Sequence, residues 1–313
     1  MSDTPLLIHI GYHKTATTWM QTKLFQPAQG YRMLADHDEI FTHAVRPHGL
    51  TFTPDAMRAL IAERRAGLPE GHVAVVSSEI LSGHPFFGGQ MSDTYAHRLK
   101  AIAPDAKILV SIRAQLKILP SVYMQYVLRG GTLPYDRFFE GTDWPGFFGF
   151  EHTHFEYDRL IALYQELFGA ENVHVMTQES LKADMEAACT ALAGFAGNSA
   201  YAGLTEALRE VRGASYPEYT VAVHRRLNHF YRSPVTPGPF LAVDPSGFKM
   251  RRRAISLLRR PPFSTLFGAK RPVTDYVRRT YGGQFAASNA RLAEIVAHPI
   301  DLSAYEGGNG SNG

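Results

Sequence analysis

Residues 8–19 read IHIGYHKTATTW. In order, they have the character of an apolar strand, a glycine turn, a lysine, a cluster of threonines and the start of a helix. Backbone N–H groups in such a turn and at a helix N-terminus point toward an anion, and Lys14 adds a mobile positive charge. The sequence therefore predicts a phosphate-binding loop, whose expected contacts are Gly11, His13, Lys14, Thr15, Ala16, Thr17 and Thr18.

Two other interpretations fit this loop less well. A nucleoside-triphosphate loop of the GxxxxGK[ST] type would need a second glycine directly before the lysine and a longer spacing from the first. An ordinary strand-to-helix turn with a solvated lysine would not need three threonines beside that lysine.

Short apolar runs recur along the chain and predict buried strands. Each run is too short for a helix and is apolar on both faces, which is typical of the middle of a parallel sheet. The four expected strands are residues 6–10, 73–77, 107–112 and 172–177.

Helical patterns separate these strands. Thr53 and Pro54 are expected to begin the helix over residues 55–65, as N-cap and first helical residue. Further helices are expected over residues 93–103, 160–168, 185–195 and 284–296. Alternating strands and helices predict an α/β fold with a P-loop-like central parallel β-sheet flanked by helices, and ligands bind beyond the carboxyl ends of such strands.

The character of the chain changes after about residue 200, where glycine, proline and basic runs become frequent. We expect an α/β core over residues 1–200 and a smaller, mainly helical and irregular C-terminal excursion over residues 201–306 that packs back on the core. The tail over residues 307–313 is rich in glycine and asparagine and is expected to be disordered.

The composition is that of an ordinary globular protein, with 313 residues, 45% hydrophobic residues and a formal net charge of +3. A charge this small on a chain of this length does not indicate nucleic acid as a partner. The single cysteine, Cys189, favours a reducing compartment, and neither a secretory signal nor an apolar span is recognisable. We therefore expect a cytoplasmic protein, and its oligomeric state stays open.

A second candidate site lies where the strand over residues 107–112 ends. Arg113 follows this strand directly, and Ser121 lies eight residues later in a helical segment. A guanidinium can bind phosphate in a bidentate manner, and a serine on the next helix can complete the site. A triphosphatase would usually hold magnesium with an aspartate at such a strand end. The alternative for Arg113 is a surface ion pair with a carboxylate.

Together, the loop 11–18 and the pair Arg113 and Ser121 resemble the two signature sites of sulfotransferases that use 3′-phosphoadenosine 5′-phosphosulfate (PAPS). The segment RAQLKILPSVY, residues 113–123, is similar to the bacterial branch of that family, and the resemblance covers roughly residues 6–216 and 288–305. It implies an enzyme that needs no metal and releases adenosine 3′,5′-bisphosphate (PAP). Ala16 stands where the family usually has glycine, which costs little unless this residue needs a positive φ.

The resemblance also implies which residues act. Lys14, Thr15, Thr17 and Thr18 would hold the 5′-phosphosulfate, and Arg113 and Ser121 the 3′-phosphate. Late-chain basic residues bind the 3′-phosphate in some relatives, which makes Arg212, Arg251 and Arg252 further candidates. The pair His152 and His154 has no partners at metal-ligand spacing, so we expect no metal site there.

Transfer to a hydroxyl needs a general base. Glu79 follows the strand over residues 73–77 and is the first candidate, although it could instead orient Lys14 or Arg113. His37 and Asp36 are the next candidates, and His13 and His84 come after them.

The acceptor stays open among a carbohydrate, a lipid-linked molecule and a small alcohol or amine. An ATP-dependent small-molecule kinase and a non-catalytic nucleotide- or glycan-binding module are the alternative functions. The basic run over residues 249–260 is either a solvated helix face or a peripheral contact with an anionic membrane or an acidic glycan.

Overall fold

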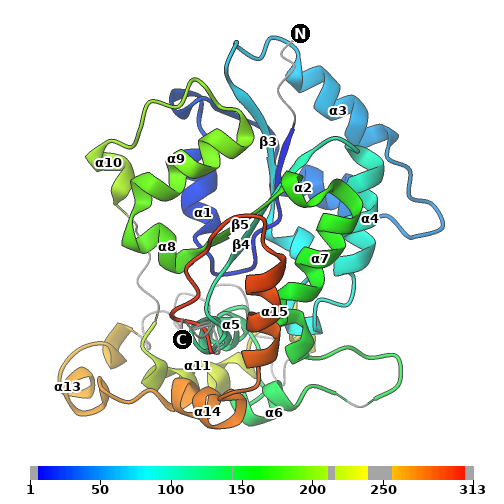
Figure 1. Ribbon diagram of the computed structural model, residues 1–313. Coiled ribbons are helices and arrows are strands. Elements are labelled where there is room, and N and C mark those ends of the chain that lie inside the picture. Colours follow the sequence, from blue (N-terminus) through cyan, green and yellow to red (C-terminus); the bar gives the residue numbers. More distant parts are fainter. Residues whose placement is uncertain (1–5, 143, 211–215, 239–255, 307–313) are drawn as a thin grey trace. The chain divides into compact units, whose positions relative to one another are not determined.

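The computed structural model describes residues 6–142, 144–210, 216–238 and 256–306 (Figure 1). These residues form two compact units. The first holds residues 6–115, 152–210 and 283–306, and the second holds residues 116–142, 144–151, 216–238 and 256–282. The expected boundary near residue 200 stays a prediction, and the tail over residues 307–313 lies outside the described residues.

The first unit is built on a five-stranded sheet in which all neighbouring strands are parallel, in the order β2-β3-β1-β4-β5. The α/β fold predicted from the sequence is therefore confirmed. The strands are β1 Leu7–His9, β2 Tyr31–Ala35, β3 Val73–Ser77, β4 Lys107–Ile112 and β5 Val173–Thr177. The sequence predicted all of these except β2, an edge strand in which Arg32 and Met33 are only half-buried.

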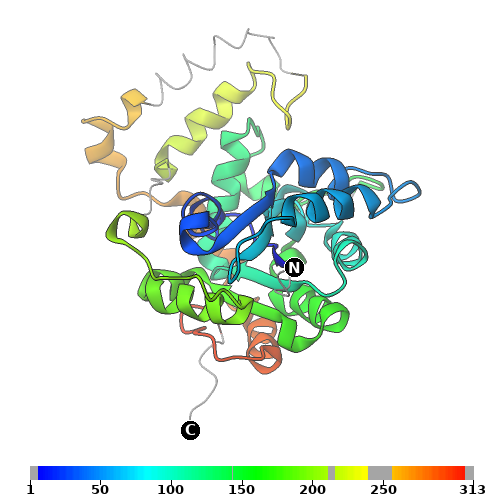
Figure 2. The same cartoon turned by 90° about the horizontal axis from the view of Figure 1, so that it is seen from above.

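Strand β1 occupies the centre of the sheet, where Leu7 lies opposite Val75 of β3 and Lys107 of β4. Helices cover both faces, with α1, α8 and α9 on one and α3, α4 and α7 on the other (Figures 1 and 2). The longer helices are α3 Asp55–Arg65, α4 Ser92–Ile102, α7 Tyr157–Phe168, α9 Met185–Ala196 and α15 Ala286–Ile295. The shorter ones are α1 Thr17–Trp19, α2 His37–Ile40, α8 Gln178–Ala183 and α10 Glu206–Arg209.

Short π and 3-10 segments complete the first unit. The π-helical segments are η1 Met20–Leu24 and η3 Phe41–Val45. The 3-10 turns are η2 Pro27–Gln29, η4 Glu79–Ser82, η5 Pro85–Phe87, η6 His152–Phe155 and η7 Ala170–Asn172.

The core on the α1, α8 and α9 side joins Leu7 and Leu109 of the sheet to Met20 and Leu192 of the helices, all with no exposed surface. Burying apolar side chains of this size stabilises the fold by roughly 1.5–3 kcal/mol each. Cys189 belongs to the same cluster and is fully buried, as its apolar surroundings in the sequence suggested.

Local capping residues mark the ends of the helices, and one predicted helix boundary is wrong. Helix α3 has Pro54 at its N-cap, so the predicted N-cap Thr53 lies one residue too early. Helix α9 is capped by the Asp184 side chain, which accepts from Ala187 N, and it ends at Gly197 with a φ of 76°. A left-handed residue that is usually glycine ends many helices in this way.

The expected C-terminal helix is α15, and it packs against α7, which itself contacts β4 and β5. Arg291 of α15 forms a 2.7 Å ion pair with Asp158 of α7, and Ser288 donates to the same carboxylate. Gln165 Nε2 also donates to Ile295 O at 2.7 Å. The described end of the chain is thereby tied to the layer of helices that covers the sheet.

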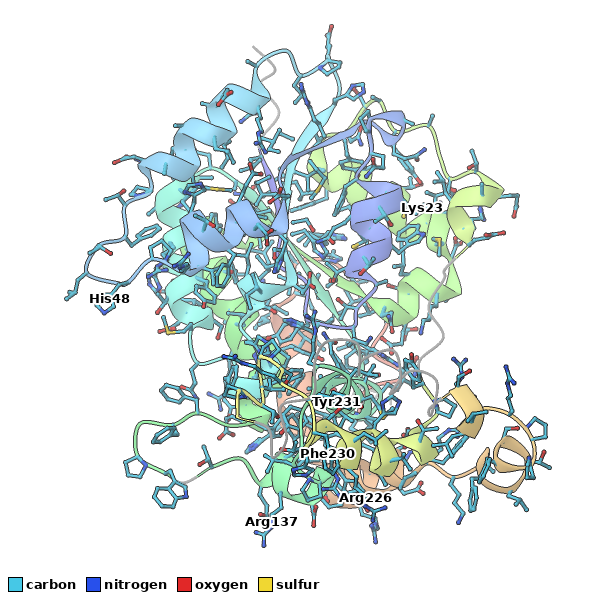
Figure 3. All side chains as sticks on the ribbon, turned by 180° about the vertical axis from the view of Figure 1, so that it is seen from behind. Lys23, His48, Arg137, Arg226, Phe230 and Tyr231 are labelled. Carbon is cyan, nitrogen blue, oxygen red and sulfur yellow. The ribbon has the colours of Figure 1, made fainter. Side chains whose placement is uncertain are left out.

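The second unit is helical and aromatic. Its helices are α5 Gln115–Leu128, α6 Tyr135–Glu140, η8 Glu218–Thr220, α11 Val221–Asn228, α13 Phe263–Phe267 and α14 Pro272–Tyr281. The first residue of α5, Gln115, still belongs to the first unit. Phe139 contacts the rings of Phe138, Phe150 and Tyr281 with centroid distances of 5.2, 4.9 and 5.8 Å. Figure 3 shows Arg137 on α6, Arg226 in α11, and Phe230 and Tyr231 just after α11.

No helix among the described residues is both long enough and apolar enough to cross a lipid bilayer.

Candidate functional site

A buried histidine at the end of β1 links the three central strands. The imidazole of His9 has no exposed surface, and its Nδ1 lies 2.8 Å from Ser77 Oγ of β3. Its Nε2 lies 2.9 Å from Ser111 Oγ of β4. Burial lowers the pKa of His9 to about 3, so the ring is neutral and can donate through one nitrogen and accept through the other.

The same network reaches the loop that follows β1. Thr15 Oγ1 lies 2.8 Å from Ser111 Oγ and donates to Tyr12 O at 2.5 Å. The Thr15 hydroxyl is therefore engaged in the interior, where it fixes the path of the loop. Sequence reasoning did not single out His9, although a histidine in an otherwise apolar strand was a visible signal.

Gly11 is required by close packing. A Cβ at this position would lie 2.0 Å from Ser111 Oγ and 2.5 Å from His9 Nε2, far inside van der Waals contact. The glycine expected from the sequence as a turn former therefore also serves to let the loop pass over the His9 network.

Two residues of the loop that are not glycine adopt the left-handed conformation, Lys14 with a φ of 69° and Ala16 with a φ of 70°. Alternation of right- and left-handed residues turns successive N–H groups toward one side and forms a concavity that binds anions. Ala16 therefore has the positive φ at which an alanine costs stability relative to glycine.

We expect Ala16→Gly to raise the free energy of unfolding by about 1 kcal/mol, because a Cβ in the left-handed region costs roughly 1–2 kcal/mol. Urea denaturation of the two proteins measures this difference. The matched control is Ala59→Gly on the exposed side of α3, which should instead destabilise by about 1 kcal/mol. A loss of stability in Ala16→Gly would contradict the strain.

Lys14 and Arg113 are electrostatically coupled. Partial burial lowers the pKa of Lys14, and the positive charge of Arg113 lowers it further. Arg113 follows β4, the neighbour of β1, so both cations belong to the carboxyl ends of adjacent strands. A lysine whose charge is destabilised by a nearby arginine favours an anion with more than one negative charge beside the two cations.

Arg113 also has a carboxylate nearby. Burial lowers the pKa of Arg113, while the negative charge of Glu179 opposes this shift. Glu179 accepts from Ala114 N at 3.4 Å and from Tyr305 Oη at 3.2 Å, which holds it beside the end of β4. Arg113 thus combines both interpretations, a cation in the strand-end region and the neighbour of an acidic side chain.

The remaining loop residues differ in exposure and in their contacts. Thr17 Oγ1 is buried and has no hydrogen-bond partner among the described residues, as expected for a hydroxyl that a ligand would satisfy. Thr18 is exposed at the start of α1. His13 faces His84, with ring centroids 5.7 Å apart. Gln178 Nε2 of α8 donates to Lys14 O at 3.2 Å and ties the loop to the segment after β5.

Two of the candidate bases lie at the end of β3. Glu79 is half-buried and begins the turn after Ser78. His37 Nδ1 lies 2.9 Å from Ser78 Oγ, so His37 is beside the residue that precedes Glu79. Asp36 instead caps α2, because its carboxylate accepts from Glu39 N at 2.9 Å within a capping box. The geometry favours Glu79 and His37 over Asp36.

Histidines 84 and 154 have structural contacts. His84 Nδ1 accepts from Phe86 N at 3.3 Å, and the His154 ring packs on Tyr12 with a centroid distance of 4.9 Å. Among the described residues, no group of three or more histidine, cysteine or carboxylate side chains is arranged to hold a metal ion.

Ser121 belongs to the second unit, where it lines a cavity of about 490 Å³. The cavity is also lined by Arg259 and Arg271, and the Arg259 guanidinium lies over the Tyr216 ring at 5.5 Å. Glu218 reaches the same cavity, but its carboxylate accepts from Val273 N and Thr274 N of α14. A hydroxyl and two guanidinium groups around one cavity can bind phosphate.

Sequence reasoning missed Arg259 and Arg271 in this role and named Arg212, Arg251 and Arg252, which lie outside the described residues. The visible signal was the long basic stretch that contains Arg251, Arg252 and Arg259. Which of its arginines would line a cavity depended on folding of the second unit.

No protein-family model and no curated protein matches this chain. Among solved structures, a sulfotransferase from Alicyclobacillus acidocaldarius is similar, with 17% identity and a TM-score of 0.49 over 95% of this chain and 97% of that one. The sulfotransferase domain of the Synechococcus PCC 7002 olefin synthase has 12% identity and a TM-score of 0.39 over 81% of this chain and 95% of that one. Mouse sulfotransferase SULT7A1 complexed with PAP has 11% identity and a TM-score of 0.37 over 88% of this chain and 89% of that one. At TM-scores below 0.5 such similarity decides nothing about activity, so the function has to be inferred from the side chains.

Proposed function

We propose that this protein is a PAPS-dependent sulfotransferase of the bacterial type. The observation that carries the proposal is that Lys14 and Arg113 follow the carboxyl ends of the adjacent strands β1 and β4, where the charge of Arg113 lowers the pKa of Lys14. An ordinary strand-to-helix turn has no reason to hold a lysine whose charge is destabilised by a neighbouring arginine. A doubly phosphorylated nucleotide between them gives that reason.

Each unit, taken by itself, has residues that suit a phosphate group. In the first unit, the left-handed Lys14 and Ala16 and the unsatisfied Thr17 hydroxyl suit a phosphosulfate. In the second unit, Ser121 with Arg259 and Arg271 suits a phosphate monoester. That Arg113 and Ser121 bind the 3′-phosphate of the donor, as the resemblance implies, stays part of the proposal.

In the proposed reaction, an oxygen or nitrogen of the acceptor forms a bond to sulfur while the bond from sulfur to the phosphate oxygen breaks. The negative charge that grows on that bridging oxygen is stabilised by the Lys14 ammonium. The acceptor's proton passes to the Glu79 carboxylate or to His37 Nε2, for which the Ser78 hydroxyl can hold Nδ1. We further propose a carbohydrate, a lipid-linked molecule or a small alcohol or amine as acceptor. A cytoplasmic location is consistent with the single cysteine.

A small-molecule kinase is the alternative enzyme. Kinases of the P-loop type hold magnesium with an aspartate at a strand end, and here Arg113 follows β4. A non-catalytic binding module would keep the donor site without a base, whereas Glu79 follows β3 and His37 contacts the preceding residue, Ser78, which supports an enzyme.

Calorimetry with PAP tests the proposal. We expect PAP to bind equally well with and without magnesium, and Arg113→Ala to weaken binding about tenfold or more, since hydrogen bonds to a charged group contribute about 1.5–3 kcal/mol. The control is Arg209→Ala, which removes a cation paired with Glu186 at 3.1 Å. Magnesium-dependent binding of ATP in preference to PAP would replace the proposal with the kinase. Tight PAP binding without transfer of labelled sulfate to any acceptor in a library would leave the binding module.

A further inference from the structure

Helix α13 of the second unit presents its apolar side chains outward. Phe263, Leu266 and Phe267 are 42%, 67% and 36% exposed. Their spacing places all three on one face of the helix. Ser264 and Gly268, on the other side, line the cavity described above. This arrangement is the reverse of an ordinary surface helix, which buries its apolar face and exposes its polar one.

Leu257, which lies shortly before α13 in the sequence, is also exposed, at 59%. We call Leu257, Phe263, Leu266 and Phe267 the apolar surface. Single exposed apolar residues need no explanation, but three on one face of a short helix favour an interaction site.

The stretch of sequence that contains the apolar surface is strongly basic. Residues 245–274 contain eight lysines and arginines and no aspartate or glutamate. The whole chain has 32 basic and 29 acidic residues, so the rest of the chain carries 24 basic residues against 29 acidic ones. Of the eight cations, Arg259, Arg260, Lys270 and Arg271 lie among the described residues, and for the other four only their charge is used.

We propose that the apolar surface docks onto an anionic lipid bilayer. Aromatic and leucine side chains flanked by arginine and lysine are the composition of segments that lie in the membrane interface. Each basic residue near an anionic surface strengthens binding roughly fivefold. A second copy of this chain fits less well, because a symmetric contact would bring two strongly basic surfaces together.

The docking surface is independent of sulfuryl transfer and would hold for any activity of the first unit. If the proposed function is also correct, docking brings the enzyme to the surface where lipid-linked acceptors reside. That narrows the acceptor to the lipid-linked class.

Cosedimentation with phosphatidylcholine vesicles, with and without phosphatidylglycerol, tests the docking surface. We expect the protein to bind the anionic vesicles, to bind less in high salt, and to bind pure phosphatidylcholine far more weakly. Leu266→Ser with Phe267→Ser should lower the partition coefficient about tenfold or more, because two large apolar side chains no longer insert. Arg260→Gln with Lys270→Gln should lower it by a comparable factor and reduce the salt dependence.

The matched control is Arg226→Gln with Phe230→Ser, which removes a cation and an aromatic ring from α11 and the turn after it (Figure 3). Phe230 is 39% exposed, close to the value for Phe267. This variant should bind the vesicles like the unmodified protein. PAP calorimetry on all variants separates loss of docking from loss of the donor site, and circular dichroism checks that each variant is folded.

Leu266→Trp gives a second readout, since the new indole fluorescence should shift to the blue on anionic vesicles and be quenched by brominated lipid. Equal binding to neutral vesicles, or unchanged binding of Leu266→Ser with Phe267→Ser, would overturn the proposal. So would a lipid-free dimer, found by sedimentation velocity, that the same double variant abolishes, because a second copy would then be the occupant.

Discussion

Replacing Lys14 with methionine should lower the turnover number for sulfuryl transfer about 100- to 1000-fold, the range found when a charge-stabilising donor is removed from an active site. Methionine keeps an unbranched stem, so the loop can retain its path over Ser111. The dissociation constant of PAP should change much less than turnover, because the charge that Lys14 stabilises grows during transfer. Steady-state kinetics and calorimetry on the same preparations measure the two effects.

Lys23→Met is the control for removal of a lysine, because Lys23 is exposed on η1, shortly after the loop (Figure 3). Its turnover should stay normal. The pH profile of kcat/KM gives a second test. Since burial and Arg113 lower the pKa of Lys14, the alkaline loss of activity should begin below the ordinary lysine value of 10.5. An unaltered turnover in Lys14→Met would remove Lys14 from the chemistry.

The two candidate bases can be separated in the same assay. Glu79→Gln and His37→Gln both keep size and polarity, and neither should alter PAP affinity. If Glu79 is the base, only Glu79→Gln abolishes transfer, whereas a near-normal turnover in that variant assigns the proton to His37 or another group.

Acidification should destabilise the protein steeply. His9, His154 and His174 are buried, and desolvation lowers the pKa of each from 6.5 to about 3. The neighbouring His84 contributes to the lowered pKa of His154, and His298 contributes to that of His174. Between these two values the unfolded chain binds three more protons than the folded one. Stability is therefore full above pH 6.5 and falls as the pH drops toward 3.

The expected slope is about 4 kcal/mol per pH unit, since each proton contributes about 1.4 kcal/mol. A typical domain has only about 5–15 kcal/mol of stability in total, so unfolding should be complete within a few pH units. Urea denaturation between neutral and mildly acidic pH measures the slope. The three histidines belong to the first unit, and the loss should appear in its unfolding transition.

His174→Phe should reduce this slope by about a third, because one of three equal contributions disappears. The ring of His174 stacks on His298 with centroids 4.2 Å apart, and phenylalanine can keep this contact. His48→Gln changes an exposed histidine in the loop before α3 and should leave the slope unchanged (Figure 3). If the free energy of unfolding hardly changes between pH 6.5 and mildly acidic pH, these histidines are solvated or charged in the folded protein.

Much of the first unit could be predicted because its strands are local signals. A parallel strand buried on both faces reads as a continuous apolar run, and β1, β3, β4 and β5 all have this pattern. Strand β2 was missed because Arg32 and Met33 are only half-buried and its sequence, YRMLA, mixes polar and apolar residues. The phosphate loop was visible for the same local reason, since strand, glycine, lysine and threonines are contiguous.

The sequence by itself determined the parallel α/β class, the place of the loop after β1 and the cation that follows β4. Only the tertiary structure decided that Thr15 turns inward, that Ala16 is left-handed, and that Ser121 shares a cavity with Arg259 and Arg271. The reason is distance along the chain. His9 meets partners 68 and 102 residues away, and these contacts exist because β1 lies between β3 and β4 in the sheet. Local patterns specify strands and turns, whereas strand order decides which side chains meet.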